Sequence, residues 1–285
     1  MNVWVEAARP RTLTAAVAPV LVGTSVAEEV IAWRALAALV VALALQVGVN
    51  YANDLFDGIR GIDTTERTGP RRAVASGLVS PDAMKGAVAL SLLVAASAGA
   101  LLAVAVGYEL LVVGLLCFAA ALAYSGGPRP YGAAGLGELF VFVFFGLVAT
   151  VGATYVQLER VVIESVLAAV PVGLLATAIL VVNNLRDMAT DEVAGKVTLA
   201  VRLGHGRTRT LFRGLVLGSF PWLPLIAGAA RSAWPLLPFL TLPFTRLLDQ
   251  AVAHDAAPQL IRALTGTARL QFAFGALLAI GLWIT

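Results

Sequence analysis

Two stretches of the chain bring carboxylate and amide side chains together where a long apolar run ends. They are Asn50, Asn53, Asp54 and Asp57 in the first stretch (50–63), and Asn183, Asp187 and Asp191 in the second (183–191). The spacing is that of one helix face in both cases: i, i+3, i+4 and i+7 in the first, and i, i+4 and i+8 in the second. We therefore predict two acidic stripes, each on one face at the end of a membrane helix.

The side chains of these stripes offer hard oxygen ligands. Such ligands select hard cations, and Mg²⁺ typically takes one or two carboxylates together with phosphate oxygens and water. Two facing stripes would hold Mg²⁺ against a diphosphate, where the metal neutralises the leaving group as a C–O bond breaks. The alternative is that each aspartate caps a helix or pairs with Arg60, Arg67 or Arg186. Several carboxylates at membrane depth are costly, which favours the metal site.

Basic residues near the stripes suit the same ligand. Lys and Arg side chains clamp phosphate oxygens through charge-assisted hydrogen bonds. The candidates on the same side of the chain are Arg67, Arg71, Arg72, Arg129 and Lys196. Each of them is alternatively an anchor that only orients the chain in a membrane.

The composition is that of an integral membrane protein. Hydrophobic residues make up 59% of the 285 residues, charged residues only 13%, and the mean hydropathy is +0.88. A soluble domain would carry roughly twice this share of charge. Cys117 lies inside an apolar run and His205 and His254 are far apart, so we expect no disulfide, thiolate or histidine metal site. No cluster of basic and aromatic residues indicates a nucleic-acid partner.

The stripes must be positioned by membrane helices. A helix that crosses the hydrocarbon core needs about 20 mainly apolar residues. We expect an all-α fold in which residues 1–285 form one polytopic domain with nine transmembrane helices. The expected spans are 12–28, 34–53, 85–105, 109–125, 136–156, 163–185, 210–229, 233–249 and 267–285. Prolines inside the later spans predict kinks or broken turns.

The distribution of positive charge predicts the orientation. With nine spans and a cytoplasmic N-terminus, only Arg34, Arg160 and Arg231 of the 20 Lys and Arg residues fall outside. The C-terminus is then outside, and both acidic stripes face the cytoplasm beside long loops near 54–84 and 186–209. A cleaved signal peptide is the alternative interpretation of residues 1–27. Its removal would leave eight helices and place the stripes outside.

The acidic motifs, with the basic residues that follow them, resemble the two signatures of the UbiA-type membrane prenyltransferases. The first is Asn53-Asp54-x-x-Asp57-x-x-x-x-x-Asp63 with Arg67-Thr-Gly-Pro-Arg-Arg72, and the second runs from Asn183 through Asp187, Asp191 and Lys196 to Gly204. The segment Tyr124-Ser-Gly-Gly-Pro-Arg129-Pro-Tyr131-Gly, followed by Gly135-Leu-Gly-Glu138, is similar more narrowly to the menaquinone branch. That branch prenylates 1,4-dihydroxy-2-naphthoate. The likeness covers about Arg9 to Gly204.

The resemblance implies a fold and a reaction. The fold is a nine-helix bundle around a lateral cavity, with a cytoplasmic cap of loops, in the cell (inner or plasma) membrane. The reaction uses polyprenyl diphosphate bound with Mg²⁺, which ionises to an allylic carbocation that an electron-rich aromatic ring attacks. In the menaquinone branch the carboxyl-bearing ring carbon is alkylated and CO₂ is lost, which gives demethylmenaquinol.

The resemblance also implies residue roles. Asp54, Asp57, Asp187 and Asp191 would bind the metal, Asn50 and Asn53 would support them, and Arg67, Arg72, Arg129 and Lys196 would face the diphosphate. Tyr124 would stabilise the allyl cation through its ring face, or else belong to the interfacial aromatic belt. The family often has Lys where Arg129 stands, and the planar guanidinium does not guarantee the same phosphate contact. Glu138 receives no mechanism, because a lone Glu near an interface is more often structural.

Two alternative functions remain open at this stage. One is the same chemistry on another acceptor, such as 4-hydroxybenzoate, homogentisate, haem or chlorophyllide. The other is a cation-coupled transporter, although transporter ion sites tend to lie near the bilayer midplane in broken helices, whereas the stripes lie at helix ends. The sequence predicts neither the prenyl chain length, the oligomeric state, the route of lipid entry nor the base that serves the acceptor.

Overall fold

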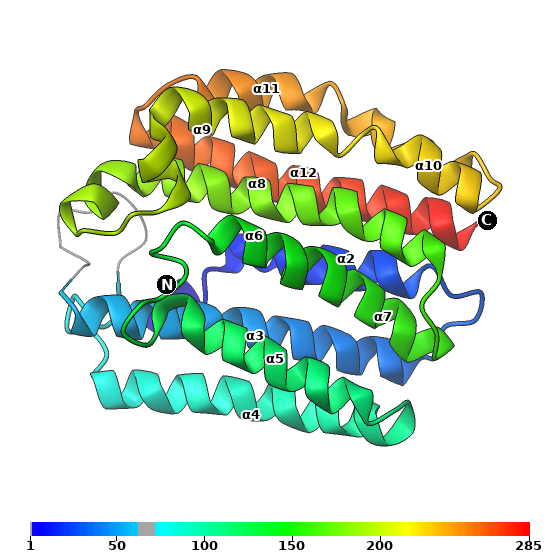
Figure 1. Ribbon diagram of the computed structural model, residues 1–285, viewed down its shortest axis with the longest axis horizontal. Coiled ribbons are helices and arrows are strands. Elements are labelled where there is room, and N and C mark those ends of the chain that lie inside the picture. Colours follow the sequence, from blue (N-terminus) through cyan, green and yellow to red (C-terminus); the bar gives the residue numbers. More distant parts are fainter. Residues whose placement is uncertain (1, 62–71) are drawn as a thin grey trace.

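The computed structural model describes residues 2–61 and 72–285, and these ranges form an all-helical fold without strands. The first half contains α1 (Val3–Ala7), η1 (Pro10–Thr12), α2 (Thr14–Thr24), α3 (Ala32–Ile59), α4 (Pro81–Ala105), α5 (Glu109–Ser125) and α6 (Gly137–Val141). The second contains η2 (Phe142–Val148), α7 (Ala149–Leu158), α8 (Ile163–Val193), α9 (Leu199–Gly218), α10 (Trp222–Ala229), η3 (Trp234–Thr241), α11 (Phe244–Val252) and α12 (Ala257–Trp283). The long helices run side by side, with α8 and α12 inside the stack (Figure 1).

Six helical segments of the described chain are long and apolar enough to cross a membrane. They are Ala32–Ile59, Pro81–Ala105, Gly137–Leu158, Ile163–Val193, Leu199–Ala229 and Ala257–Trp283. Two shorter apolar helices, α2 and α5, match two more of the expected spans. The protein is therefore a multi-pass membrane protein, while the count of nine spans stays a prediction. Helix α2 is buried along most of its length and packs against α12 and α7.

The remaining expected span, 233–249, is the least regular. Pro235 and Pro238 lie in the 3₁₀ helix η3, and α11 begins directly after Pro243. This agrees with the expected broken turns, because proline removes a backbone donor and clashes with the preceding turn. Pro171 behaves differently: it lies inside α8, which continues without a break from Ile163 to Val193.

Helix α9 begins well before the expected start at 210. Thr198 caps its first turn by accepting a hydrogen bond from the backbone N–H of Val201 (3.4 Å). The helix then kinks at Gly204, whose φ of 71° and ψ of 170° are not helical. Glycine adopts this positive φ without a Cβ clash. The Arg-rich segment that we expected to be a loop is thus helical, in two parts that meet at this kink.

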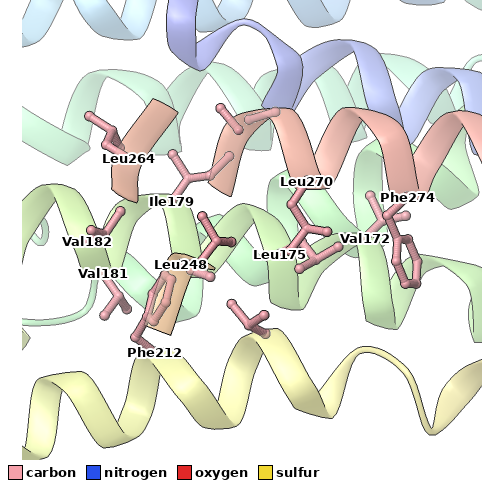
Figure 2. Packing of buried hydrophobic residues seen from close by; sticks show 14 of the residues in the cluster. Val172, Leu175, Ile179, Val181, Val182, Phe212, Leu248, Leu264, Leu270 and Phe274 are labelled. Atoms are coloured by element: carbon pink, nitrogen blue, oxygen red, sulfur yellow. The ribbon is translucent and has the colours of Figure 1, made fainter. Parts of the chain in front are cut away.

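The largest core cluster joins the second half of the chain around α8. Figure 2 shows Val172, Leu175, Ile179, Val181 and Val182 of α8 facing Phe212 of α9, Leu248 of α11, and Leu264, Leu270 and Phe274 of α12. Since lipid is as apolar as these side chains, close packing and dispersion hold the helices together here. The apolar window of α8 is 72% buried within the protein, the largest share among the six candidate spans, which explains its central position.

A π-helix interrupts the span between α6 and α7. Phe142–Val148 forms η2, with a wider turn than the α-helices on either side. At Gly146 a Cβ would lie 2.6 Å from the Cα of Gly173, so the two glycines bring this span into backbone contact with α8. π-Helical turns are rare and occur frequently at functional sites. This turn lies on the wall of the cavity described below.

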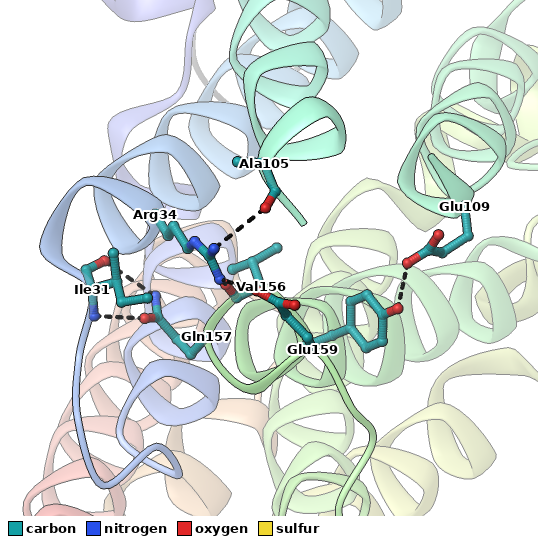
Figure 3. Close-up of polar contacts among 8 residues, drawn as sticks. Ile31, Arg34, Ala105, Glu109, Val156, Gln157 and Glu159 are labelled. Atoms are coloured by element: carbon teal, nitrogen blue, oxygen red, sulfur yellow. Dashed lines mark hydrogen bonds and ion pairs between the residues drawn. The ribbon is translucent and has the colours of Figure 1, made fainter. Parts of the chain in front are cut away.

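A polar network ties the helices together at the end of the bundle opposite the acidic stripes (Figure 3). The guanidinium of Arg34 donates to the carbonyls of Val156 (3.0 Å) and Ala105 (3.3 Å) and pairs with Glu159 (2.9 Å). Gln157 accepts from the N–H of Ile31 (2.8 Å), and Tyr155 donates to Glu109. Four helix ends, those of α3, α4, α5 and α7, are therefore fixed relative to one another.

Candidate active site

The four aspartates of the acidic stripes are buried at the ends of α3 and α8. Their exposed fractions are 1% for Asp54, 2% for Asp57, 3% for Asp187 and 8% for Asp191. A buried carboxylate is costly unless it is paired and hydrogen-bonded. The partners of each aspartate therefore indicate what it does in this state of the protein.

Lys196 connects the two stripes. Its ammonium lies 2.7 Å from the Oδ2 of Asp57, across 139 residues of sequence. The turn that presents it uses Gly195 at a φ of 73°, and the Lys196 N–H donates to the carbonyl of Asp191 (2.8 Å). The ion pair joins an aspartate of the first stripe to a basic residue beside the second stripe, and the sequence did not predict it.

Asp187 is paired within its own helix. Arg186 donates to it from Nε (2.8 Å) and Nη2 (2.7 Å), and the same Nη2 donates to the side-chain oxygen of Asn183 (3.0 Å). This two-point contact is a strong charge-assisted arrangement. Both partners are almost completely buried. Pairing with Arg186 is the alternative that the sequence left open for the aspartates, and for Asp187 the structure shows this pairing in a buried position.

Asp54 holds a loop. Its two oxygens accept hydrogen bonds from the backbone N–H groups of Val74 (2.9 Å) and Ala73 (3.0 Å). The carboxylate thereby fixes the segment that follows the undescribed residues 62–71 against the end of α3. Sequence spacing alone assigned Asp54 to a metal, and nothing in the sequence pattern identifies backbone amides as its partners.

The amides of the first stripe bind the N-terminal segment. Asn50 donates to the carbonyl of Ala8 (2.8 Å). The side-chain amide of Asn53 is oriented so that its nitrogen and its oxygen both form hydrogen bonds. The nitrogen donates to Asp57 (2.7 Å), and the oxygen accepts from Arg9 (3.2 Å). Arg9 is a site residue that our sequence analysis counted only as an inside charge. It adopts a positive φ of 52° just before η1.

Tyr124 and the loop after α5 lie beside the stripes. The rings of Tyr124 and Tyr131 meet edge to face at 5.5 Å, and Tyr131 stacks on Phe140 at 4.0 Å. At Gly132 a Cβ would lie 2.8 Å from the carbonyl oxygen of Tyr124, so a glycine is required for this approach. Arg129 is exposed on the same loop.

Tyr131 anchors this loop as a neutral donor. Its hydroxyl donates to the carbonyl of Ala120 (2.9 Å), and burial raises the pKa of the Tyr131 hydroxyl. Arg60 holds the start of the loop through the carbonyls of Ser125 (2.8 Å) and Gly127 (2.5 Å). The loop is thus fixed to both α3 and α5.

An apolar cavity of about 470 Å³ begins at these residues. Its polar end is lined by Arg9, Asn50, Asn53, Tyr124 and Asn183. Apart from Thr12, Gln46 and Tyr131, the rest of its wall is apolar and comes from α2, α3, α4, α5, α6, η2, α7 and α8. Val156, whose carbonyl accepts from Arg34, also lines it. The cavity therefore extends from the acidic stripes toward the opposite end of the bundle.

Glu138 and Asn184 form a buried pair beside the polar end. The Asn184 amide donates to Glu138 Oε1 (3.0 Å). The other oxygen, Oε2, is buried and has no hydrogen-bond partner among the described residues. The two residues are 46 positions apart, so helix periodicity gave no signal for this pair.

Three residues that the sequence analysis named lie outside the residues that the structure describes. Arg67 belongs to residues 62–71, as do Asp63 and Arg71. Arg72 begins the described chain after the gap, and its carbonyl accepts from Ser76.

The donor set fits Mg²⁺ in its chemistry. The aspartates at the ends of α3 and α8 are hard oxygen ligands. Lys196 connects the two helix ends, because its ammonium pairs with the Asp57 carboxylate and its backbone N–H donates to the Asp191 carbonyl. In residues 2–61 and 72–285, however, no three His, Cys, Asp or Glu side chains converge in a group that could hold a metal. Lys196 and Arg186 instead neutralise Asp57 and Asp187. Metal binding would therefore require these cations to exchange partners.

Comparisons with known proteins identify the family of the chain. The chain is 51% identical to the 1,4-dihydroxy-2-naphthoate octaprenyltransferase of Mycobacterium tuberculosis over 75% of this chain and 74% of that protein. It is 37% identical to the Escherichia coli enzyme of the same name over 91% of this chain and 87% of that protein. A UbiA homologue from Archaeoglobus fulgidus, solved with GPP and Mg²⁺, has the same fold (TM-score 0.65, 18% identity, 97% of this chain and 99% of that one). The profile of the UbiA prenyltransferase family matches residues 16–283, and the chain belongs to this family.

Proposed function

We propose that the protein transfers a polyprenyl group from polyprenyl diphosphate to 1,4-dihydroxy-2-naphthoate, with Mg²⁺ and with loss of CO₂, to give demethylmenaquinol. The observation that carries this proposal is the cluster of buried carboxylates and cations next to Asn53 and Asn183, two residues that line the end of an apolar cavity. The charged cluster suits a diphosphate, and the apolar cavity suits a polyprenyl chain. The names of the bacterial relatives support the acceptor.

The bond changes balance without an added oxidant or reductant. The allylic C–O bond breaks, and its electron pair leaves with the diphosphate. The ring carbon that bears the carboxylate forms a C–C bond to the allylic cation. The C–CO₂⁻ bond then breaks, CO₂ departs, and its electron pair restores the aromatic ring.

We assign the residues of the site separate roles in binding the metal and the diphosphate. Asp54, Asp57, Asp187 and Asp191 would hold Mg²⁺, which supplies charge neutralisation at the diphosphate when bound. Asn50 and Asn53 would keep the N-terminal segment in place at the polar end. The cations, Arg67, Arg72, Arg129 and Lys196, would bind diphosphate oxygens. The archaeal neighbour of the same fold was solved with GPP and Mg²⁺, which supports an allylic diphosphate and Mg²⁺ as the ligands.

Tyr124 would act on the hydrocarbon side of the bond that breaks. Tyr124 lines the cavity, as do Asn53 and Asn183. An aromatic face there stabilises a developing allylic cation. The cavity walls would exclude water, which otherwise would capture the cation as an alcohol.

We propose the following placement in the membrane. Residues 1–285 form one domain with nine spans in the cell (inner or plasma) membrane, with the N-terminus in the cytoplasm and the C-terminus outside. The loops that follow α3, α5 and α8 form a cytoplasmic cap. Two hydrogen bonds link the last two of these loops: Val197 donates to Ala133 (3.0 Å), and Arg202 donates to Ala134 (2.9 Å).

The experiment is a product assay on purified protein in detergent, run beside Asp187→Ala. With Mg²⁺, a long-chain prenyl diphosphate and 1,4-dihydroxy-2-naphthoate, we expect a prenylated naphthoquinol from the wild type and none from the variant. Near-normal turnover of a folded Asp187→Ala protein would refute the metal role. Product only from 4-hydroxybenzoate or homogentisate would keep the chemistry and refute the acceptor.

A further inference from the structure

A second cavity, of about 560 Å³, lies between α9 and α11. It is separate from the apolar cavity of the candidate active site, because no residue lines both. Its lining residues are Phe212, Arg213, Val216 and Leu217 of α9, and Leu242, Pro243, Thr245, Arg246 and Asp249 at the start of and within α11. Phe212 and Val216 are buried, whereas Leu217 and Leu242 are exposed. The cavity is therefore a groove with a buried apolar floor that is open at the surface of the bundle.

Two arginines and one aspartate make up the charged part of this groove. Arg213 donates from Nε to Asp249, and the two side chains remain 45% and 49% exposed. The other nitrogens of the Arg213 side chain bond to no described residue. Arg246 is exposed, and its guanidinium forms no hydrogen bond or ion pair within the described chain. Because a guanidinium carries five N–H donors, most donors of both arginines are available to a ligand, and the groove has one net positive charge.

The neighbouring charges on this face of α9 are used by the fold. Arg209, one turn before Arg213, donates to the carbonyl of Val252 (2.9 Å) and pairs with Asp255 (2.5 Å). His205, one turn earlier again, lies 2.6 Å from the same carboxylate. These contacts hold α9 against the end of α11, and Arg246 takes no part in them. Joining the two helices therefore does not account for Arg246.

The groove lies near the end of the bundle that carries the acidic stripes. The connection from α8 to α9 and the connection from α11 to α12 are both at this end (Figure 1). Arg213 follows Arg209 by one turn, about 6 Å along the helix. Arginines within membrane helices are costly unless they reach the interface or a partner. Basic pockets between membrane helices are sites at which anionic lipid headgroups bind.

We propose that this groove binds one anionic phospholipid, with its phosphate between Arg213 and Arg246 and an acyl chain against Val216, Leu217 and Leu242. The single negative charge of a phosphodiester matches the single net positive charge of the groove. Guanidinium groups form paired hydrogen bonds to phosphate oxygens. A lipid also covers the apolar floor, which a free anion does not. The bound lipid would brace α9 against α11, and this inference does not depend on the proposed prenyl transfer.

The test follows thermal unfolding of the purified protein in neutral detergent micelles as phosphatidylglycerol is added. We expect the Tm of the wild type to rise by about 3–6 °C, and equal concentrations of phosphatidylcholine or inorganic phosphate to change it by less than about 1 °C. Arg246→Gln should raise the phosphatidylglycerol concentration at half of the shift roughly fivefold. Arg207→Gln is the matched control and should leave that concentration unchanged. Arg207 is also an exposed arginine of α9, but its position two residues from His205 places it on the other side of the helix.

A second variant, Leu217→Trp, tests the apolar part of the groove without changing its charge. Its indole would occupy the space of the acyl chain, so it should also raise the concentration at half of the shift. This variant keeps the test decisive if Arg246→Gln does not fold. An equal shift with phosphatidylcholine or with inorganic phosphate would overturn the inference, as would equal effects of Arg246→Gln and Arg207→Gln. A dimer that Leu217→Trp converts into a monomer would assign the groove to a second copy of the chain instead.

Discussion

The ion pair between Asp57 and Lys196 allows a quantitative prediction about the site. The two charges are 2.7 Å apart, and their side chains are 3% and 16% exposed. At an effective dielectric constant of about 20, unit charges roughly 3 Å apart attract by about 5 kcal/mol. Much of this offsets the desolvation of the two groups. A coupling free energy of about 1–3 kcal/mol is therefore expected between the two side chains.

The assay is a double-mutant cycle with Asp57→Asn, Lys196→Met and the combined variant. The free energy of unfolding is measured by denaturant titration in mixed micelles. Lys196→Met alone leaves a buried, unpaired carboxylate and should be the most destabilised of the three proteins. The combined variant should be more stable than the sum of the single effects predicts. Additive effects within about 0.5 kcal/mol would refute the view that this pair joins the two acidic stripes.

Three further predictions follow from other parts of the molecule. Asp54→Asn turns one oxygen that accepts a backbone N–H into a donor, so the free energy of unfolding should fall by about 1–3 kcal/mol and turnover should be lost; a stable and active variant would contradict both roles of Asp54. Arg34→Met should lower thermal stability without changing KM for the aromatic acceptor, because Arg34 lies at the opposite end of the bundle; an altered acceptor KM would contradict that placement. EDTA should stop turnover and added Mg²⁺ should restore it, whereas turnover in EDTA would remove the metal from the reaction.

The acidic stripes were predictable from the sequence because helical periodicity alone places their members on one face. The family prediction is confirmed by the profile match to residues 16–283. The ion pair between Lys196 and Asp57 was not predicted, because Lys196 was expected to face the diphosphate. The metal roles of the four aspartates stay predictions; Asp54 binds backbone amides, and Asp57 and Asp187 pair with cations.

The partners of these side chains were not predictable, because they come from distant segments or from loop backbone. Asp54 binds two amides whose position depends on how the loop after α3 folds. Arg9 enters the site only because Asn50 holds the N-terminal segment against α3. Glu138 meets Asn184 only once α6 and α8 have packed. Single-sequence periodicity contains none of this information.

Some helices were predictable from the sequence and others were not. The cores of the apolar spans were predictable because their length and composition suit a bilayer, as for α4 and α5. The start of α9 at Leu199 was not, because its first turns carry Arg202, Arg207 and Arg209 and have the composition of a loop. The π-helix at Phe142–Val148 has no sequence signal of its own, since it depends on the contact between Gly146 and Gly173.

A competition assay tests the central claim most directly. The purified protein receives Mg²⁺, one long-chain prenyl diphosphate, and equal amounts of 1,4-dihydroxy-2-naphthoate labelled in its carboxyl carbon and 4-hydroxybenzoate. We predict a prenylated naphthoquinol together with one labelled CO₂ for each product formed. Prenylated hydroxybenzoate as the main product, or naphthoate product that keeps its label, would contradict the account.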